Sequence, residues 1–544
     1  MQPNNLFLFL SLRKFKVVPA RKRQLLRWAC LQNSVIPNLL RDSCFSVFAR
    51  LVLDAFLSGT KKNTSFVQNL NMSRKRRQKL YNQILENLEI TGVAAEGKAI
   101  ARHNDMVVFV AFGAPGDVVD VRIKKVQRRH VEAEIVRFHR QSTRRATPFC
   151  EHFGICGGCK WQHLPYDEQL KYKEQQVTDN IIRIGKVDYD FELIPVKGSA
   201  DTDFYRNKLE YTFAARRWLS PQEIAQGDEI VDLQALGFHI PGFYDKVLDI
   251  KKCWLQPDPS NEIRLAVKDF ALKNQITFFD YKEHSGLLRN IIIRNNLKGE
   301  FMVILVCAPG EEDKRDLLLQ YIKEKFVEVL SVFYMISDKK NSSVGDLEPV
   351  HYHGARWLTE EMEGLQFQIG PLSFYQTNSR QAYELYKIAR DFAALSGDEL
   401  VYDLYTGTGT IALFVAALAR KVIGVEYVEE AVAHARENAQ LNSIENVEFT
   451  AGDMAKVLTE EFIQAKGMPD VIITDPPRAG MHPDVTRQIL HSGAKKIVYV
   501  SCNPATQARD IELLAEKYSV TKVQAVDMFP HTQHVESVVL LERF

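Results

Sequence analysis

Two patterns of hydrophobic and polar residues follow one another along this chain. Between residues 88 and 140, short apolar runs such as MVVFVAF and VVDVRIKKV are separated by Gly, Asn-Asp and Pro-Gly turn signals, which is typical of β-strands and hairpins. About five such strands in roughly 60 residues predict a small closed barrel of the OB type. From about residue 350, apolar strands alternate with Ala-rich helical segments, as in ELVYDLYTGTGTIALFVAALARKVIGVE. This βαβ pattern predicts a parallel-rich, doubly wound sheet.

The region between these patterns is mixed. A helix is predicted over residues 166–184, and it precedes strand-like stretches such as FYRNKLEYTF and GEFMVILVC. We therefore expect a multi-domain α/β protein with an OB-like barrel over residues 72–140, a central α/β domain over 141–345 and a Rossmann-like domain over 346–544. The longest apolar runs, FLFLSL and IALFVAALA, are shorter than the roughly 20 residues that span a bilayer. No membrane partner is expected.

The first 71 residues differ in composition from the rest. Residues 1–77 contain 15 Lys and Arg but only two Asp, a net charge of +13, so the remainder of the chain carries −11 of the total of +2. Such a basic extension is typical of an organellar transit peptide. It is also what a misassigned start would give, with Met72 as the true first residue, and we favour this second interpretation.

Because the bulk of the chain is mildly acidic, a polyanion must bind to local basic patches rather than to a global field. The distal part of the expected barrel carries such a patch. Its members are Arg122, Lys124, Lys125, Arg128, Arg129, Arg137, Arg140, Arg144 and Arg145. A solvated charged surface is an equally good interpretation of the charge alone. On a small barrel, however, the patch indicates a nucleic-acid contact.

Three cysteines are clustered in CEHFGICGGCKW. Cys150, Cys156 and Cys159 have C-x5-C-x2-C spacing, and Cys253 in DIKKCW is a natural fourth ligand. Four thiolates suit either an iron–sulfur cluster or a structural zinc ion, and the spacing leaves both open with a slight preference for iron. With no secretory signal in the sequence, such a cluster is typical of a cytoplasmic metal-binding protein.

The first βαβ unit carries the residues of a nucleotide-type site. Gly407 and Gly409 in VYDLYTGTGT allow close approach of a ligand to the backbone at a helix N-terminus. Glu426 ends the next strand, where an acid can bind ribose hydroxyls. Asp453 follows the third strand, where it can meet an adenine amino group. Residues at three successive strand ends favour an S-adenosylmethionine (SAM) site over an NAD(P) site, which usually has a denser glycine pattern.

Three further residues lie at strand ends nearer the C-terminus. Asp475 precedes two prolines in VIITDPPRAG, and Cys502 follows the apolar strand in IVYVSCNPAT. Glu536 starts another apolar strand in HTQHVESVVLL. A thiol becomes a nucleophile in a partly exposed setting that lowers its pKa. A thiol, a carboxylate and a methyl donor in one crevice together indicate C5 methylation of a pyrimidine.

Several motifs in this order carry a specific resemblance. They are CEHFGICGGCKW, FYRNKLEYTF, SFYQTN, DLYTGTGT, DPPRAG, SCNPAT and HTQHVE. Over residues 72–544 the chain resembles the RumA/TrmA family of SAM-dependent RNA (uracil-5-)-methyltransferases. Relatives often have Cys at the position of Thr406 and Asn or Thr at the position of Thr410, so this chain departs mildly from the family pattern.

The resemblance implies a fold, cofactors and site residues. It implies that the barrel is a TRAM domain that binds RNA, and that Cys150, Cys156, Cys159 and Cys253 hold a [4Fe–4S] cluster. The SAM-binding residues that it implies are Gln376, Tyr405, Thr410, Glu426, Asp453 and Asp475. It also implies that Cys502 is the catalytic nucleophile and Glu536 the catalytic base.

The expected substrate is 23S ribosomal RNA, because transfer-RNA relatives generally lack both the TRAM domain and the cluster. The same chemistry on a transfer-RNA uridine is the nearest alternative. A non-catalytic or redox-sensing iron–sulfur RNA-binding protein would not need Cys502 paired with Glu536. A DNA cytosine methyltransferase would carry a Pro-Cys dipeptide, so DNA is not an expected partner. We expect a cytoplasmic monomer.

Overall fold

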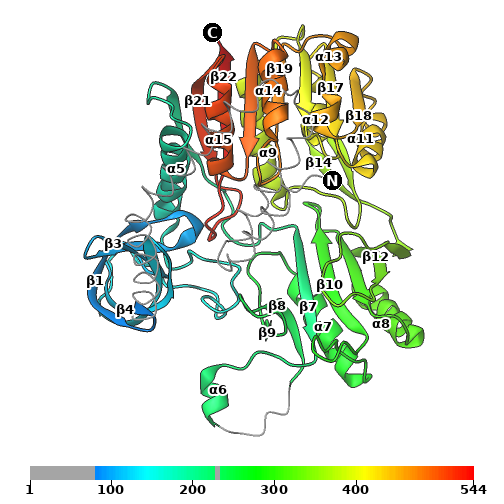
Figure 1. Cartoon of the computed structure of the whole chain (residues 1–544). Coiled ribbons are helices and arrows are strands. Elements are labelled where there is room, and N and C mark those ends of the chain that lie inside the picture. The colour runs from blue at the N-terminus through cyan, green and yellow to red at the C-terminus, as the bar shows by residue number, and fades with distance from the viewer. Residues whose placement is uncertain (1–79, 227–232) are drawn as a thin grey trace, which may run out of the picture. The chain divides into compact units, whose positions relative to one another are not determined.

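The N-terminal strands close into a barrel. The computed structural model describes residues 80–226 and 233–544, so the extension 1–71 and the expected start at Met72 lie outside the described residues. The strands β1 (Ile84–Val93), β2 (Ala99–His103), β3 (Met106–Ala111), β4 (Val118–Val126) and β5 (His130–Arg140), with the short helix η3 (Ala95–Gly97), pair in the order β1-β2-β3-β5-β4. Alternate side chains such as Val108, Val110, Val119 and Val121 are fully buried inside, as the period of a strand requires. The predicted five-stranded barrel is confirmed (Figure 1).

The basic residues predicted as an RNA contact on this barrel are partly paired with acids. Lys124 and Arg122 lie 3.1 and 3.8 Å from Glu134, and Lys125 lies 3.3 Å from Glu132. Further ion pairs are Arg140–Glu89, Arg144–Glu168 and Arg145–Asp117. Because these acids offset much of the positive charge, the barrel has a weaker positive potential than its Lys and Arg content suggests.

A seven-stranded sheet occupies the middle of the chain, in the order β13-β12-β11-β10-β7-β8-β9. Its strands are β7 (Lys208–Ala214), β8 (Ala235–His239), β9 (Val247–Asp249), β10 (Leu288–Asn295), β11 (Phe301–Cys307), β12 (Val329–Ile336) and β13 (Val350–Gly354). Helices α7 (Ser260–Lys273) and α8 (Glu312–Lys325) cover one face, where Ile263 and Leu318 share a hydrophobic core with Ile291. Helix α6 (Pro221–Gln226) lies between β7 and β8 in the chain.

The C-terminal sheet has eight strands in the order β18-β17-β16-β19-β20-β22-β21-β6. They are β6 (Glu192–Lys197), β16 (Leu400–Leu404), β17 (Lys421–Glu426), β18 (Val447–Ala451), β19 (Val471–Thr474), β20 (Lys496–Ser501), β21 (Tyr518–Val526) and β22 (Glu536–Arg543). The run from β18 to β20 is parallel, whereas β22 is antiparallel to both of its neighbours. The hairpin β14 (Leu358–Met362) and β15 (Leu365–Ile369) precedes this sheet in the chain.

Helices cover both faces of the C-terminal sheet and give it two separate cores. Helices α9 (Ser379–Ala393), α10 (Thr410–Ala416) and α11 (Glu429–Leu441) pack on one face. The other face is covered by α5 (Tyr166–Arg183), α12 (Met454–Val457), α13 (Glu460–Lys466), α14 (Pro483–His491) and α15 (Pro504–Leu514). The predicted parallel-rich, doubly wound architecture is confirmed, and so is the helix expected at 166–184 (Figure 1).

An early segment of the chain contributes to this late sheet. Strand β6 pairs in parallel with β21, and helix α5 packs against α15. The boundaries predicted for the central and C-terminal domains, 141–345 and 346–544, stay a prediction. No helix in the described ranges 80–226 and 233–544 has both the length and the apolar character to span a membrane.

A buried ion pair ties α5 to the segment that follows β21. Lys173 Nζ donates to Asp527 Oδ1 at 2.5 Å and to the Phe529 carbonyl at 3.1 Å, and both charged side chains are fully buried. Burial lowers the pKa of Lys173, because the ammonium loses its water, whereas Asp527 acts to raise it. The pair therefore fixes the start of the loop that leads into Glu536.

We expect Lys173→Met to lower the free energy of unfolding by about 3–5 kcal/mol, because the buried Asp527 carboxylate would lose its cationic partner. Urea denaturation of the full chain measures this loss. The double variant Lys173→Met/Asp527→Leu should recover most of it, since no unpaired charge remains. Lys171→Met, on the exposed side of the same helix, should leave the unfolding midpoint nearly unchanged. Equal losses in the single and double variants would contradict this account.

Candidate active site

The parallel strands of the C-terminal sheet end along one edge, and the predicted site residues lie there. Glu426 is the last residue of β17, Asp475 follows β19, and Cys502 follows β20. Strand β22 is antiparallel to β20 and begins with Glu536, so this carboxylate reaches the same edge. All four residues line one cavity of about 1720 Å³. Ligands of doubly wound sheets bind at this edge, so the cavity is the candidate active site.

The loop after β16 presents its backbone to this cavity. Tyr405, Gly407 and Gly409 have positive φ angles of 63°, 57° and 81°. A Cβ atom at Gly409 would lie 2.9 Å from the ring of Phe449, so only glycine fits there. The Gly407 N–H donates to Glu426 Oε2 at 3.1 Å. The glycine loop and the acid of the next strand therefore hold each other in place.

Five of the six predicted SAM-binding residues line the cavity: Gln376, Tyr405, Thr410, Glu426 and Asp475. Asp453 is not among the lining residues. Its Oδ1 accepts from the Ala455 N–H at 3.1 Å and caps α12, while Oδ2 lies 3.4 Å from Lys456. This capping accounts for its position without a ligand, and a role for it in binding stays a prediction.

A residue of the central region positions the loop that carries Gln376. Asn207 donates its backbone N–H to the Thr377 carbonyl at 2.9 Å. Its side-chain amide donates to the Gln376 carbonyl at 2.9 Å and to Ser379 Oγ at 2.7 Å, and Ser379 in turn donates to buried Glu360 at 2.6 Å. This network connects the central sheet to the edge of the cavity.

The protein groups around Cys502 favour its thiol form. Burial raises the pKa of Cys502 to about 11, with Glu536 and Asp475 adding to the shift and Arg478 opposing it. Burial and Asp475 likewise hold the pKa of Glu536 well above its ordinary value, and burial raises the pKa of Asp475 to about 7. The sequence led us to expect a setting that lowers the pKa of this thiol. The protein groups around Cys502 instead raise it.

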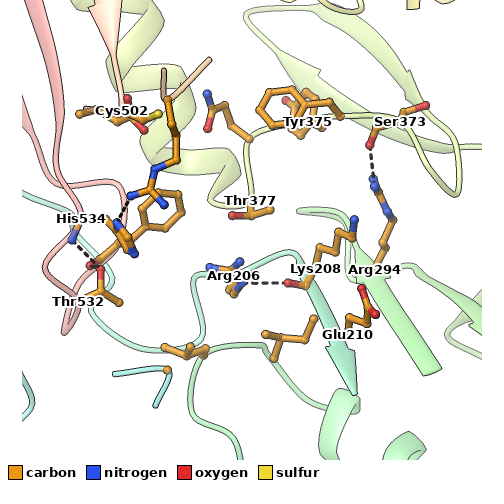
Figure 2. Close-up of a pocket in the computed structure, with 18 of the residues that line it drawn as sticks. Arg206, Lys208, Glu210, Arg294, Ser373, Tyr375, Thr377, Cys502, Thr532 and His534 are labelled. Carbon is orange, nitrogen blue, oxygen red and sulfur yellow. Dashed lines mark hydrogen bonds between the residues drawn. The ribbon is translucent and has the colours of Figure 1, made fainter. Parts of the chain in front are cut away.

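Two residues on the Cys502 side of the cavity, Arg478 and His534, were not singled out from the sequence. Figure 2 shows His534 and Cys502 on the same side of the cavity, and Arg478 Nη2 lies 3.0 Å from His534 Nδ1. The Arg478 carbonyl accepts from Asn503 Nδ2 at 2.9 Å, which ties the Pro-Pro turn to the turn after Cys502. Both residues belong to recognised motifs, DPPRAG and HTQHVE, so their motif positions were the available signal.

Two known families match the chain, one in the barrel and one in the C-terminal part. Residues 363–544 match the tRNA (Uracil-5-)-methyltransferase family, and residues 86–136 match the TRAM domain. An uncharacterized RNA methyltransferase of Bacteroides thetaiotaomicron is 57% identical over 453 residues, which cover 83% of this chain and 100% of that protein. The chain belongs to the RumA/TrmA family. It is thus a SAM-dependent RNA methyltransferase of the uracil-5 type, with an N-terminal TRAM domain.

Two further comparisons extend over most of this methyltransferase. An uncharacterized RNA methyltransferase of Porphyromonas gingivalis is 53% identical and covers 84% of this chain and 99% of its own length. The crystal structure of the Pyrococcus abyssi tRNA (uracil-54, C5)-methyltransferase in complex with S-adenosyl-L-homocysteine is 27% identical. It superposes with a TM-score of 0.64 and covers 84% of this chain and 100% of that chain.

The methyltransferase sheet also buries a carboxylate beneath the glycine loop. Asp403 Oδ2 accepts from Thr406 Oγ1 at 2.5 Å, while Oδ1 has no partner among the described residues. Burial raises the pKa of Asp403 to about 7, and Asp475 adds to the shift. The sequence pointed to the glycines of DLYTGTGT but not to this acid, whose burial depends on the strands that flank it.

The four predicted cluster cysteines of the methyltransferase line the same cavity. Burial raises the pKa of Cys159 to about 12 and that of Cys253 to about 11, and neighbouring cysteines add to both shifts. The Gly158 N–H donates to Cys156 Sγ at 3.4 Å. Within residues 80–226 and 233–544, however, no three His, Cys, Asp or Glu side chains converge closely enough to hold a metal ion. The thiols are thus neighbours without forming a finished metal site.

Proposed function

We propose that this methyltransferase makes 5-methyluridine in RNA with Cys502 as the nucleophile and Glu536 as the base. The observation that carries the proposal is the placement of a thiol and a carboxylate, from adjacent strands β20 and β22, in one cavity with the glycine loop. C5 of uracil is too weak a nucleophile to attack a methyl group unaided. Covalent addition of a thiolate to the ring is the usual way to split such a step into easier ones.

In this scheme the Cys502 thiolate adds to C6 of the uracil, forming an S–C bond and an enolate. C5 then takes the methyl group from SAM, which leaves as neutral S-adenosylhomocysteine. Glu536 removes the C5 proton, the electron pair restores the C5–C6 double bond, and Cys502 leaves as the thiolate. A stacked base is out of reach of the thiol, so the target uridine must be flipped out or single-stranded.

The residues at the glycine loop fit SAM as the methyl donor. Gln376, Tyr405, Thr410 and Glu426 would hold it at the edge of the sheet. S-adenosyl-L-homocysteine bound to the Pyrococcus abyssi enzyme supports this assignment. SAM supplies a methyl group on a cationic sulfonium, and a positive charge near Cys502 offsets the two carboxylates that raise the pKa of its thiol.

We further propose that Cys150, Cys156, Cys159 and Cys253 hold a [4Fe–4S] cluster. Their donor set fits one, because four thiols from two segments line one cavity beside a backbone N–H that already donates to sulfur. Iron and sulfide analysis of anaerobically purified protein tests this assignment. Stoichiometric zinc in place of iron would overturn it.

The first candidate substrate is 23S ribosomal RNA, on the resemblance of the cysteine segment to cluster-bearing relatives. Transfer RNA is a second candidate, because the Pyrococcus abyssi enzyme is named for uracil 54 of tRNA and matches 84% of this chain. That match is longer than residues 141–544, so it also extends into the region before residue 141 that holds the barrel. A TRAM barrel is therefore no argument against a transfer-RNA substrate. A cytoplasmic, monomeric enzyme fits either assignment.

Mass-spectrometric mapping of 5-methyluridine in ribosomal and transfer RNA, from cells with and without this protein, tests the proposed function. Loss of one 5-methyluridine from 23S RNA supports the first candidate. Loss confined to transfer RNA supports the second, and unchanged 5-methyluridine in both RNAs would contradict the proposal.

A further inference from the structure

Three charged side chains of the central sheet face the active-site cavity and have no part in the proposed chemistry. Lys208 and Glu210 flank buried Leu209 on β7, so they point to the same face of the sheet. Arg294 of β10 lies directly opposite Lys208 in the antiparallel pairing of these strands. All three line the cavity, and Figure 2 shows them side by side.

This arrangement is unfavourable within the protein itself. Like charges at directly opposite positions destabilise an antiparallel pair, as Lys208 and Arg294 do here. No hydrogen bond or ion pair within the described ranges reaches Lys208 Nζ. Arg294 is only 5% exposed and donates to the Ser373 carbonyl at 2.6 Å, but its Nε has no partner among the described residues. Buried donors are normally satisfied, so Lys208 Nζ and Arg294 Nε are available to a ligand.

Burial also acts on the charge of each group. It lowers the pKa of Lys208 to about 8, with Arg294 adding to the shift and Glu210 opposing it. It raises the pKa of Glu210, which Lys208 counters. Burial lowers the pKa of Arg294 to about 10. Asn290 Nδ2 donates to Glu210 Oε1 at 3.2 Å, so this carboxylate has one partner within the protein. Lys208 Nζ has lost water without gaining a partner among the described residues, and such a group binds a complementary polar ligand at little further desolvation cost.

We propose that Lys208, Glu210 and Arg294 form a second base-recognition subsite, which binds a guanine next to the target uridine in the RNA. The inference rests on the proposed function, because it takes RNA as the occupant of the cavity. Two cationic donors side by side match the adjacent acceptors O6 and N7 of guanine, and one carboxylate matches its N1–H and N2–H donors. A backbone phosphate fits less well, because the Glu210 carboxylate would repel it.

Binding of short RNAs to the full-length protein tests this proposal. The probe is a fluorescent nonamer with a central uridine in an adenosine background, in which one flanking position at a time is changed to guanosine, inosine, cytidine or uridine. We expect guanosine at one flanking position to lower Kd about 10-fold. Inosine, which lacks the N2 amino group, should retain only part of the gain. Glu210→Gln and Lys208→Met should both remove it.

Glu328→Gln, at an exposed turn before β12, is the matched control and should keep the guanosine preference. Thermal melting of each variant checks that it folds, and Glu210→Gln is isosteric. Equal Kd for all oligonucleotides with the unaltered protein would overturn the proposal. A uniform loss for every oligonucleotide in Lys208→Met, with a smaller salt dependence, would overturn it in favour of a phosphate contact. Because the readout is binding, it is independent of whether methyl transfer is observed.

Discussion

Cys502→Ala should abolish methyl transfer to RNA, with a loss of at least about 10⁴-fold in kcat. Without the thiol, no S–C6 bond forms, and C5 of the uracil stays too weak a nucleophile to attack the methyl group. Transfer of a radiolabelled methyl group from SAM to RNA measures the loss. RNA affinity should change little, because the substitution removes only one small side chain from the wall of a large cavity.

The chain provides a matched control for this substitution. Cys307 is fully buried in β11, in the hydrophobic core of the central sheet, and burial raises the pKa of its thiol to about 12. Such a thiol is inert, so Cys307→Ala should retain methyl transfer once thermal melting shows that both variants fold. Full activity in Cys502→Ala would exclude the covalent scheme.

The residues at the edge of the C-terminal sheet were predictable because the βαβ pattern fixes where they lie. Parallel strands place all their carboxyl ends at one edge, so Glu426, Asp475 and Cys502 could be assigned to one crevice without any contact being known. The βαβ pattern alone could not assign Glu536 to this edge, because Glu536 starts its strand rather than following it. Its place in the cavity depends on β22 being antiparallel to β20, and the HTQHVE motif supplied that assignment.

Features that depend on distant pairings were not predictable in this way. Lys208 and Arg294 become neighbours only through the register between β7 and β10, and no local pattern encodes that register. Lys173 and Asp527 are 354 residues apart in the chain and give no sign of pairing in either segment. Asp453 shows the opposite relation, since a local N-cap within its own sequence neighbourhood accounts for its position, and its role in SAM binding stays a prediction.

Glu536→Gln should trap a covalent adduct between Cys502 and RNA while slowing turnover by about 10²–10⁴-fold. Glutamine has the size of glutamate but cannot take a proton, so the methylated intermediate keeps its C5 proton and cannot release the cysteine. The buried position of the carboxylate and the charge of Asp475 hold the pKa of Glu536 well above its usual range. Once ionised, such a carboxylate is a stronger base than an exposed one.

A slow-migrating enzyme–RNA band on a denaturing gel, formed only with SAM present and absent from the double variant Glu536→Gln/Cys502→Ala, measures the trapped species. Glu542→Gln, near the far end of the same strand, should turn over normally and show no band. Turnover at the unaltered rate in Glu536→Gln would remove this residue as the base. Loss of turnover without an adduct would place the role of Glu536 before methyl transfer, because no methylated covalent intermediate would then have formed.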